Sequence, residues 1–184
     1  MKPSCFNPIS DLLVVVDVQD PFINHIDDGD KVLSRCEFLV RSAKVLGVPI
    51  LATAQVPERL GSLSGRLTPY IPEVYSKNTF SAWDCPEFQK HFGTLGWTNV
   101  ILVGVESHIC VLLTAKDLMK AGLKVSVCLD AIGSRTKEGY KAATMALTQA
   151  GAKIIHTESL VYEWLKSSEH PKFKEVLDLV KLYS

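Results

Sequence analysis

The chain has 184 residues, 47% of them hydrophobic, and twenty Lys and Arg residues balance twenty Asp and Glu residues. This length predicts a single domain over residues 1–184 with enough apolar side chains for a sizeable core. A neutral chain without a long basic stripe argues against nucleic acid and membrane surfaces as partners. No apolar run approaches the ~18 residues that a bilayer-spanning helix needs.

The start of the chain and its cysteines predict a reducing, cytoplasmic location. Residues 1–8 lack the apolar run of a signal peptide. The five cysteines are odd in number and form no CxxC pair, which argues against a disulfide framework and a zinc cluster. They are Cys5, Cys36, Cys85, Cys110 and Cys128.

Apolar strands alternate with amphipathic helices from the first elements onward. Residues 12–16 form a continuous apolar run, as in a parallel strand that is covered on both faces. Apolar side chains between residues 31 and 46 recur at steps of three and four, which predicts a helix that Gly47 closes. Residues 48–53 are typical of a second strand.

The middle of the chain is less regular. Residues 54–76 are rich in Gly, Pro and Ser and predict a long loop, a feature that is usually functional or mobile. Asp84 and Glu87 then form a capping box that opens a short helix ending near Phe92.

The second half resumes the alternation of strands and helices. It predicts strands over residues 99–104, 124–129 and 152–155, with helices over 109–120, 140–150 and 171–183. Repeated strand–helix–strand units indicate an α/β fold, a three-layer αβα sandwich with a Rossmann-like parallel sheet. In such a sheet the ligand crevice lies at the carboxyl ends of the strands.

Cys110 stands where a thiol becomes chemically useful. It follows the strand over residues 99–104 and falls in the first turn of the next predicted helix. Unpaired backbone N–H groups and the helix dipole stabilise a thiolate there, so we expect a low-pKa nucleophile. The competing interpretation is a buried cysteine that only packs, as most free cysteines do.

Asp17 and Lys77 are the other candidates. Asp17 ends the first strand, where partial desolvation favours proton uptake, although a loop-capping role is the ordinary alternative. Lys77 taken alone is a surface lysine. Its neighbours Tyr75, Phe80 and Trp83, however, are the mixture expected of a small-molecule pocket.

Three ordered motifs carry a family resemblance. Val-Asp-Val-Gln-Asp-Pro-Phe at 16–22, Lys-Asn-Thr-Phe-Ser-Ala-Trp at 77–83 and Gly-Val-Glu-Ser-His-Ile-Cys at 104–110 resemble the isochorismatase-like cysteine hydrolases. Residues 51–61 and 170–175 are similar to the short isochorismatase domain-containing proteins in particular. The resemblance covers nearly the whole chain.

The resemblance implies a metal-independent cysteine hydrolase with a Cys110, Asp17 and Lys77 triad. Asp17 would deprotonate Cys110, Lys77 would stabilise the anion, and a small-molecule amide, imide or related substrate would pass through a thioester. Backbone N–H groups of Glu106 and Cys110 would form the oxyanion hole, with a cis peptide between Val105 and Glu106. Family relatives associate, so we expect a homo-oligomer, with the apolar C-terminal helix as a plausible contact face.

One departure from the wider superfamily bears on cofactors. Nicotinamidases carry an Asp-x-His metal motif after the second strand, whereas residues 53–57 of this chain contain no histidine. The five histidines show no ligand spacing, so the sequence predicts neither a metal nor another cofactor. The side chains expected to line the substrate pocket are Phe22, Gln55, Phe80, Trp83 and His108.

Two readings from other classes stay open at this point. The first is a catalytically silent interaction protein that keeps the isochorismatase fold, although such a protein has no need of the three triad residues. The second is a magnesium-dependent phosphatase or receiver domain that uses Asp17, Asp20 and Asp130. It lacks the Asp-x-Asp pair, because Gln19 occupies the second position.

Overall fold

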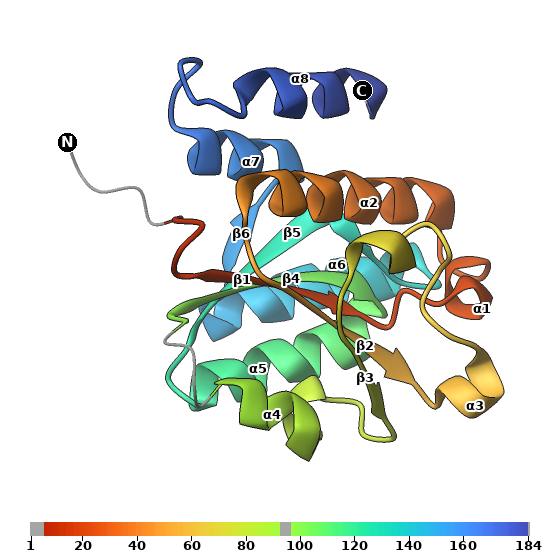
Figure 1. Ribbon diagram of the computed structural model, residues 1–184. Helices are drawn as coiled ribbons and strands as arrows, with labels where there is room; N and C mark the ends of the chain where they lie inside the picture. The colour runs from red at the N-terminus through yellow and green to blue at the C-terminus, as the bar shows by residue number, and fades with distance from the viewer. Residues whose placement is uncertain (1–5, 93–96, 184) are drawn as a thin grey trace.

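The computed structural model describes residues 6–92 and 97–183, and within them six parallel strands form one sheet (Figure 1). The strands lie in the order β3-β2-β1-β4-β5-β6. Their bounds are β1 Asp11–Val16, β2 Ile50–Gln55, β3 Val74–Lys77, β4 Asn99–Val105, β5 Lys124–Gly133 and β6 Lys153–Ile155. The predicted α/β fold with a parallel sheet is confirmed.

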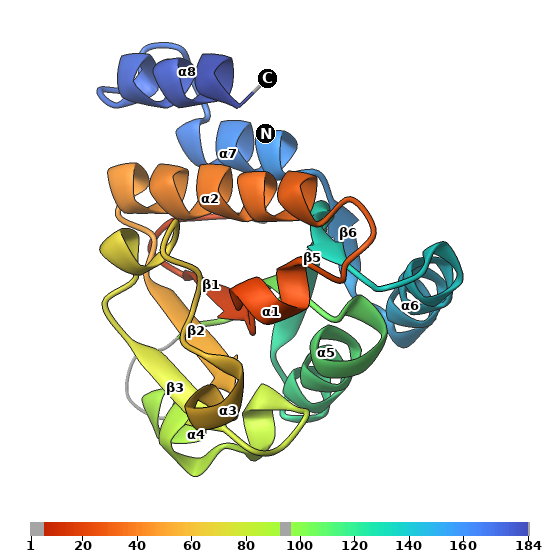
Figure 2. The ribbon, with the colours of Figure 1, turned by 90° about the vertical axis from the view of Figure 1, so that its right-hand side faces the viewer.

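Helices cover both faces of the sheet and complete the three layers (Figure 2). One face carries α2 (Gly29–Leu46), α7 (Thr157–Leu165) and α8 (Phe173–Leu182), and the other carries α4 (Pro86–Phe92), α5 (Leu112–Lys120) and α6 (Lys137–Ala150). Every residue of β1, β2 and β4 is buried, as expected for strands that meet helices on both sides. Among the described residues, no helix combines the length and the apolar character that crossing a membrane requires.

Several elements lie where the sequence did not predict them. The stretch 54–76 contains the short helices α3 (Pro57–Leu60) and η1 (Thr68–Tyr70) and runs into the edge strand β3. β3 has only four residues and a half-exposed pattern, so no apolar run marks it. α7 follows β6 after a single residue, which leaves no turn signal to separate the two elements.

The apolar face of α8 is covered by its own chain. Val176 and Leu179 are buried against the core on the α2 side, and Phe173, Val180 and Tyr183 pack on the same cluster. Because most apolar residues of α8 pack on the core at the α2 side, while Leu182 stays exposed, α8 offers only a small part of the free face that the sequence suggested for a contact between copies.

The strand order reverses at β1, because β2 and β3 lie on one side of it and β4 to β6 on the other. Such a switch point opens a crevice outside the carboxyl ends of the strands. Gly104 of β4 has a φ of 116°, and a Cβ there would lie 2.1 Å from the carbonyl oxygen of Val16, its partner in register. The segments that follow these two strands carry Asp17 and Cys110, so this glycine sets their spacing.

Gly104→Ala is expected to lower the free energy of unfolding by about 2–4 kcal/mol, because a side chain at positive φ must displace the backbone of β1. Chemical denaturation measures this. Gly65→Ala is the matched control: a Cβ there meets nothing within 4 Å, and we expect a change within about 1 kcal/mol. A loss below about 1 kcal/mol for Gly104→Ala would show that the two strands have room to separate.

Candidate active site

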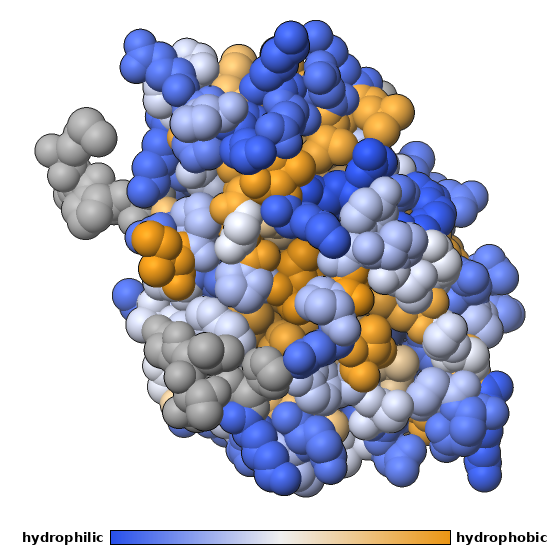
Figure 3. Space-filling view, in the orientation of Figure 1, coloured by the Kyte–Doolittle hydropathy of each residue, from blue (hydrophilic) through white to orange (hydrophobic). Residues whose placement is uncertain are grey.

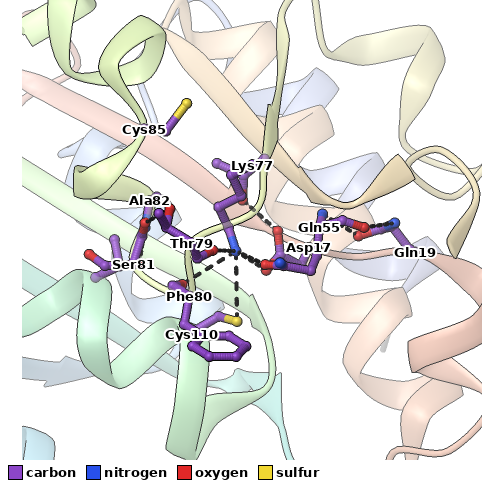
Figure 4. A network of polar contacts seen from close by, with 12 residues as sticks. Asp17, Gln19, Gln55, Lys77, Thr79, Phe80, Ser81, Ala82, Cys85 and Cys110 are labelled. Atoms are coloured by element: carbon purple, nitrogen blue, oxygen red, sulfur yellow. Dashed lines mark hydrogen bonds and ion pairs between the residues drawn. The ribbon is translucent and has the colours of Figure 1, made fainter. Parts of the chain in front are cut away.

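Asp17, Lys77 and Cys110 meet at the carboxyl edge of the sheet (Figure 4). Asp17 follows β1, Lys77 ends β3, and Cys110 lies in the π-helical turn η3 (Ser107–Val111) after β4. Nζ of Lys77 lies 2.7 Å from Oδ2 of Asp17 and 3.7 Å from Sγ of Cys110. All three residues are buried. Three segments that are far apart in sequence therefore form one buried polar cluster.

Asp17 is fixed by its backbone conformation and by Thr53. Its φ is 51°, a left-handed value that costs about 1–3 kcal/mol in a non-glycine residue, although Asp adopts it more readily than most residues. Thr53 of β2 donates its hydroxyl to Oδ1 of Asp17 at 2.8 Å. Oδ2 faces the ammonium of Lys77, but no described residue makes an aligned hydrogen bond to it. That oxygen is open to accept a proton.

Lys77 is surrounded by acceptors. Its ammonium donates to Oε1 of Gln55 at 2.5 Å and to the backbone carbonyls of Thr79 and Phe80 at 3.1 and 3.3 Å. A buried ammonium is stable only when its three donors and its charge are met in this way. Together with the carboxylate of Asp17, these acceptors hold a positive charge beside the thiol.

Two glutamines, Gln19 and Gln55, support Lys77. The sequence predicted only Gln55 as a residue of the pocket. The N–H of Gln55 donates to Oε1 of Gln19 at 2.7 Å, and Nε2 of Gln19 returns a hydrogen bond to the carbonyl of Gln55 at 3.0 Å. Nε2 of Gln55 donates to the carbonyl of Asn78 at 3.1 Å, which turns its Oε1 toward Lys77. In the sequence Gln19 stands in the motif around Asp17, but nothing there pairs it with a residue 36 positions away.

Cys110 differs in two ways from what the sequence predicted. It lies in a π-helical turn that precedes α5, not in the first turn of an α-helix. Burial, together with the negative charge of Asp17, raises the pKa of the thiol to about 12, and the nearby Lys77 lowers it by less. The expected low-pKa thiolate is therefore wrong for the resting site. The thiol is protonated, and attack requires that a base remove its proton.

The segment before Cys110 is tied to the loop after β5. The peptide bond between Val105 and Glu106 is cis, as the family resemblance implies. The carboxylate of Glu106 accepts hydrogen bonds from the N–H of Arg135 at 3.3 Å and from its Nε at 3.0 Å. The carboxylate is thereby held by Arg135.

A second tie uses two hydroxyls and a histidine. Ser107 and Ser134, both buried, share a short hydrogen bond, and Nδ1 of His108 lies 2.8 Å from Oγ of Ser134. The ring of His108 also lies against Gly139, where an added Cβ would come within 3.2 Å of Nδ1. His108 thus has a structural partner outside the pocket in which the sequence placed it.

The cluster opens onto a small cavity of about 80 Å³. Of the predicted pocket residues, Phe22, Gln55 and Phe80 line it, whereas Trp83 and His108 do not. Trp83 instead packs with the core on the α4 and α5 side of the sheet. The full lining is Asp17, Phe22, Gln55, Phe80, Val105, Glu106, Ile109 and Cys110. The sequence missed Val105 and Ile109 as lining residues because their only signal was apolarity.

A larger cavity of about 510 Å³ lies between α2, β5 and α6 and contains none of the triad residues. Several of its charged side chains pair with one another. Arg35 lies 3.8 Å and His156 3.2 Å from Oδ2 of Asp130, whose carboxylate also accepts from Thr157. Size alone would favour this cavity, but the smaller one is lined by the thiol of Cys110 and by Asp17, with the ammonium of Lys77 beside both, so the smaller one is the candidate active site.

Comparison with known proteins matches this architecture. The pattern of the isochorismatase domain covers residues 11–159. A mouse protein named isochorismatase domain-containing protein 2A is 34% identical over 95% of this chain and 84% of its own length. The chain belongs to the isochorismatase family. Its members are generally hydrolases.

Solved structures agree with this isochorismatase assignment. The structure described as MAR1 ribonuclease from Caenorhabditis elegans has a TM-score of 0.90 at 33% identity and covers 96% of this chain and 92% of its own. The ycaC gene product of Escherichia coli, described as an octameric hydrolase of unknown specificity, has a TM-score of 0.84 at 21% identity and covers 100% of both chains. The second likeness shows the fold alone.

The polar groups of this isochorismatase domain offer no evident metal site. Among residues 6–92 and 97–183, no three His, Cys, Asp or Glu side chains gather in a way that could hold a metal ion. Where nicotinamidases carry their metal motif, Thr53 binds Asp17 and Gln55 binds Lys77. These positions therefore support the triad residues instead.

Asp17→Asn is expected to lower the pKa of the Cys110 thiol, because the carboxylate that raises it is lost while Lys77 remains. The rate at which iodoacetamide alkylates Cys110 at neutral pH should then rise about tenfold for each pKa unit by which the thiol pKa falls. Lys77→Met should slow alkylation, because the thiol keeps Asp17 and loses the cation. Peptide mass mapping across a pH series measures both rates, and Lys90→Met on exposed α4 is the matched control. Equal rates in the two site variants would contradict this account.

Proposed function

We propose that this protein is a cysteine hydrolase that cleaves the C–N bond of a small-molecule amide, imide or related substrate without a metal. The observation that carries the proposal is the buried meeting of three groups: Cys110 and Asp17 line one cavity, and the ammonium of Lys77 lies against both of them. A nucleophile, a base with an open oxygen and a fixed cation are the parts that acyl transfer needs.

The first half of the reaction forms a thioester. Oδ2 of Asp17 takes the thiol proton as Sγ of Cys110 attacks the substrate carbonyl, and Lys77 stabilises the developing negative charge. Asp17 then returns the proton to the departing nitrogen, the C–N bond breaks, and an amine or ammonia leaves. The number of charges in the cluster stays constant through this transfer, which matters because an uncompensated charge in a buried site is costly.

The second half consumes water. Asp17 removes a proton from a water molecule that attacks the thioester, the C–S bond breaks, and the proton returns to Sγ as the acid product departs. The oxyanion in both halves is met by the backbone N–H groups of Glu106 and Cys110, both of which belong to residues that line the cavity. Such a donor typically contributes about 3 kcal/mol of barrier lowering.

A silent interaction protein is the alternative, and the buried ion pair disfavours it. Lys77 and Asp17 have side-chain exposures of 0% and 1%, and apolar side chains of similar volume would usually stabilise a fold equally well or better. The strained backbone of Asp17 adds a cost that packing alone does not explain.

Cys110→Ala is expected to reduce hydrolysis of a substrate by at least about 10³-fold, because no other nucleophile lines the cavity with a base beside it. Cys85→Ala, which also removes a buried thiol but not one at this cavity, should keep its activity. Dialysis of the wild type against a chelator should leave turnover unchanged. Loss of activity on chelation that zinc or iron restores would contradict the metal-free mechanism.

We also propose that the protein is a homo-oligomer. Figure 3 shows apolar surface gathered below α2, over the part of the sheet where β2 and β3 lie. β3 is an edge strand, and its Val74 is 42% exposed. Exposed strand edges and apolar patches are where protein copies associate. The Escherichia coli neighbour is described as octameric, which fits an association of this kind.

Light scattering is expected to give a multiple of the mass of one chain, 20.3 kDa. Val74→Lys should shift that mass toward the single chain, because a lysine on an edge strand opposes pairing. A mass of one chain for the wild type across a tenfold dilution would refute the assembly.

For the location we propose a reducing compartment such as the cytoplasm, in keeping with the four described cysteines, all of which are free.

A further inference from the structure

The size of the active-site cavity limits what can bind. It encloses about 80 Å³, whereas pockets for drug-sized ligands span about 300–1,000 Å³. Because such pockets hold whole drug-sized molecules, a cavity several times smaller has room for only a few non-hydrogen atoms. Those atoms must include the reacting carbonyl and the leaving nitrogen. Only a short acyl substituent remains possible.

The polar side chains in the wall are already committed to other residues. Both polar atoms of the Gln55 side-chain amide have partners, since Oε1 accepts from Lys77 and Nε2 donates to the carbonyl of Asn78. The carboxylate of Glu106 is held by Arg135. Apart from the reacting groups, each polar side chain of the described lining already has a protein partner, which leaves little capacity to recognise a polar substituent.

The rest of the lining is apolar. Phe22, Phe80, Val105 and Ile109 form it, and Phe80 is 59% exposed, whereas Val105 is fully buried. Figure 4 shows the ring of Phe80 near the sulfur of Cys110. An acyl substituent in this cavity therefore meets two aromatic rings and two branched aliphatic chains. Such walls favour hydrocarbon over polar groups.

The charges around the cavity oppose an anionic ligand. Lys77 is the nearest cation to the thiol, and it is already paired with Asp17 and surrounded by three oxygen acceptors. A second carboxylate brought in by a ligand would lie beside Asp17 with no free cation among the described lining residues. Burying an unpaired charge in this way is strongly unfavourable.

We propose, on the basis of the proposed hydrolase function, that the substrate is a small uncharged primary amide with a short apolar acyl group. A primary amide releases ammonia, so its leaving group takes the least space. Water adds across the C–N bond, and the products are ammonia and a short carboxylic acid. Once ionised, that acid is the anion that the cavity disfavours, which promotes its release. Dianions such as isochorismate and ring amides such as nicotinamide are excluded by charge and by size respectively.

A test that needs no turnover compares two alkylating agents of nearly equal size. Iodoacetamide is neutral and iodoacetate is anionic, and both react with thiolates. For Cys110 the ratio of the two rates, amide over acetate, should exceed the ratio for glutathione in the same buffer by at least tenfold. A ratio equal to or below that of glutathione would overturn the exclusion of anions, whatever the outcome of any activity assay.

A second test measures ammonia release from a graded set of amides. Acetamide, propionamide and isobutyramide should be hydrolysed, and benzamide and the anion succinamate should react at least 100-fold more slowly. Faster hydrolysis of benzamide or succinamate than of propionamide would overturn this substrate class and leave the hydrolase proposal intact. Hydrolysis of no amide, with the alkylation preference retained, would instead overturn the hydrolase function and this substrate with it.

One variant ties the selectivity to the cavity wall. Ile109→Ala should enlarge the cavity and raise the rate with benzamide relative to propionamide by at least tenfold, and Leu182→Ala, at the exposed end of α8, should leave that ratio unchanged. Thermal unfolding checks that both variants fold. If Ile109→Ala folds and the ratio does not move, the wall does not set the size limit, and the proposal fails.

Discussion

The buried ion pair between Lys77 and Asp17 is the interaction on which the site depends. The two groups lie 2.7 Å apart, and both side chains are almost completely shielded from water. Neither charge could stay in such a place alone. The need to keep both paired explains the surrounding polar residues: Thr53 holds the carboxylate, and Gln55, braced by Gln19, holds the ammonium. The positions of these polar side chains therefore follow from the need to keep the two buried charges paired.

The arrangement of the strands places this ion pair next to the thiol of Cys110. The pair joins the edge strand β3 to the end of the central strand β1, and Gly104 lets β4 approach β1 closely enough to bring the thiol of Cys110 within 3.7 Å of the ammonium. The nucleophile itself rests on a turn held through Glu106 and Ser107 to the loop after β5. Residues in or directly after β1, β2 and β4 therefore line the cavity, and Lys77 at the end of β3 lies beside two of them.

The sequence predicted the layers and singled out the three residues that meet at the sheet edge, but it did not predict features that depend on residues distant in the chain. Long apolar runs such as β1 and β4 are buried on both faces, so their composition alone identifies them. β3 is too short and too exposed to show a pattern, although it carries Lys77. The protonated state of Cys110 was missed because the position of a residue along the chain says nothing about how much of it is buried or which charges face it. Partners such as Gln19 and Gln55, or His108 and Ser134, form only when distant loops meet.

Burial of the thiol has two consequences that act together. It raises the pKa of Cys110 to about 12, which keeps the sulfur protonated and poorly reactive toward oxidants, since oxidation requires thiolate character and exposure. In the hydrolysis that we propose, the same burial makes the nucleophile depend on Asp17, because a proton must be transferred before attack. A substrate that fills the cavity excludes water and places its carbonyl next to the thiol at the moment of that transfer. Reactivity is therefore confined to molecules that fit, and the selectivity of the cavity and the protection of the sulfur have one physical cause.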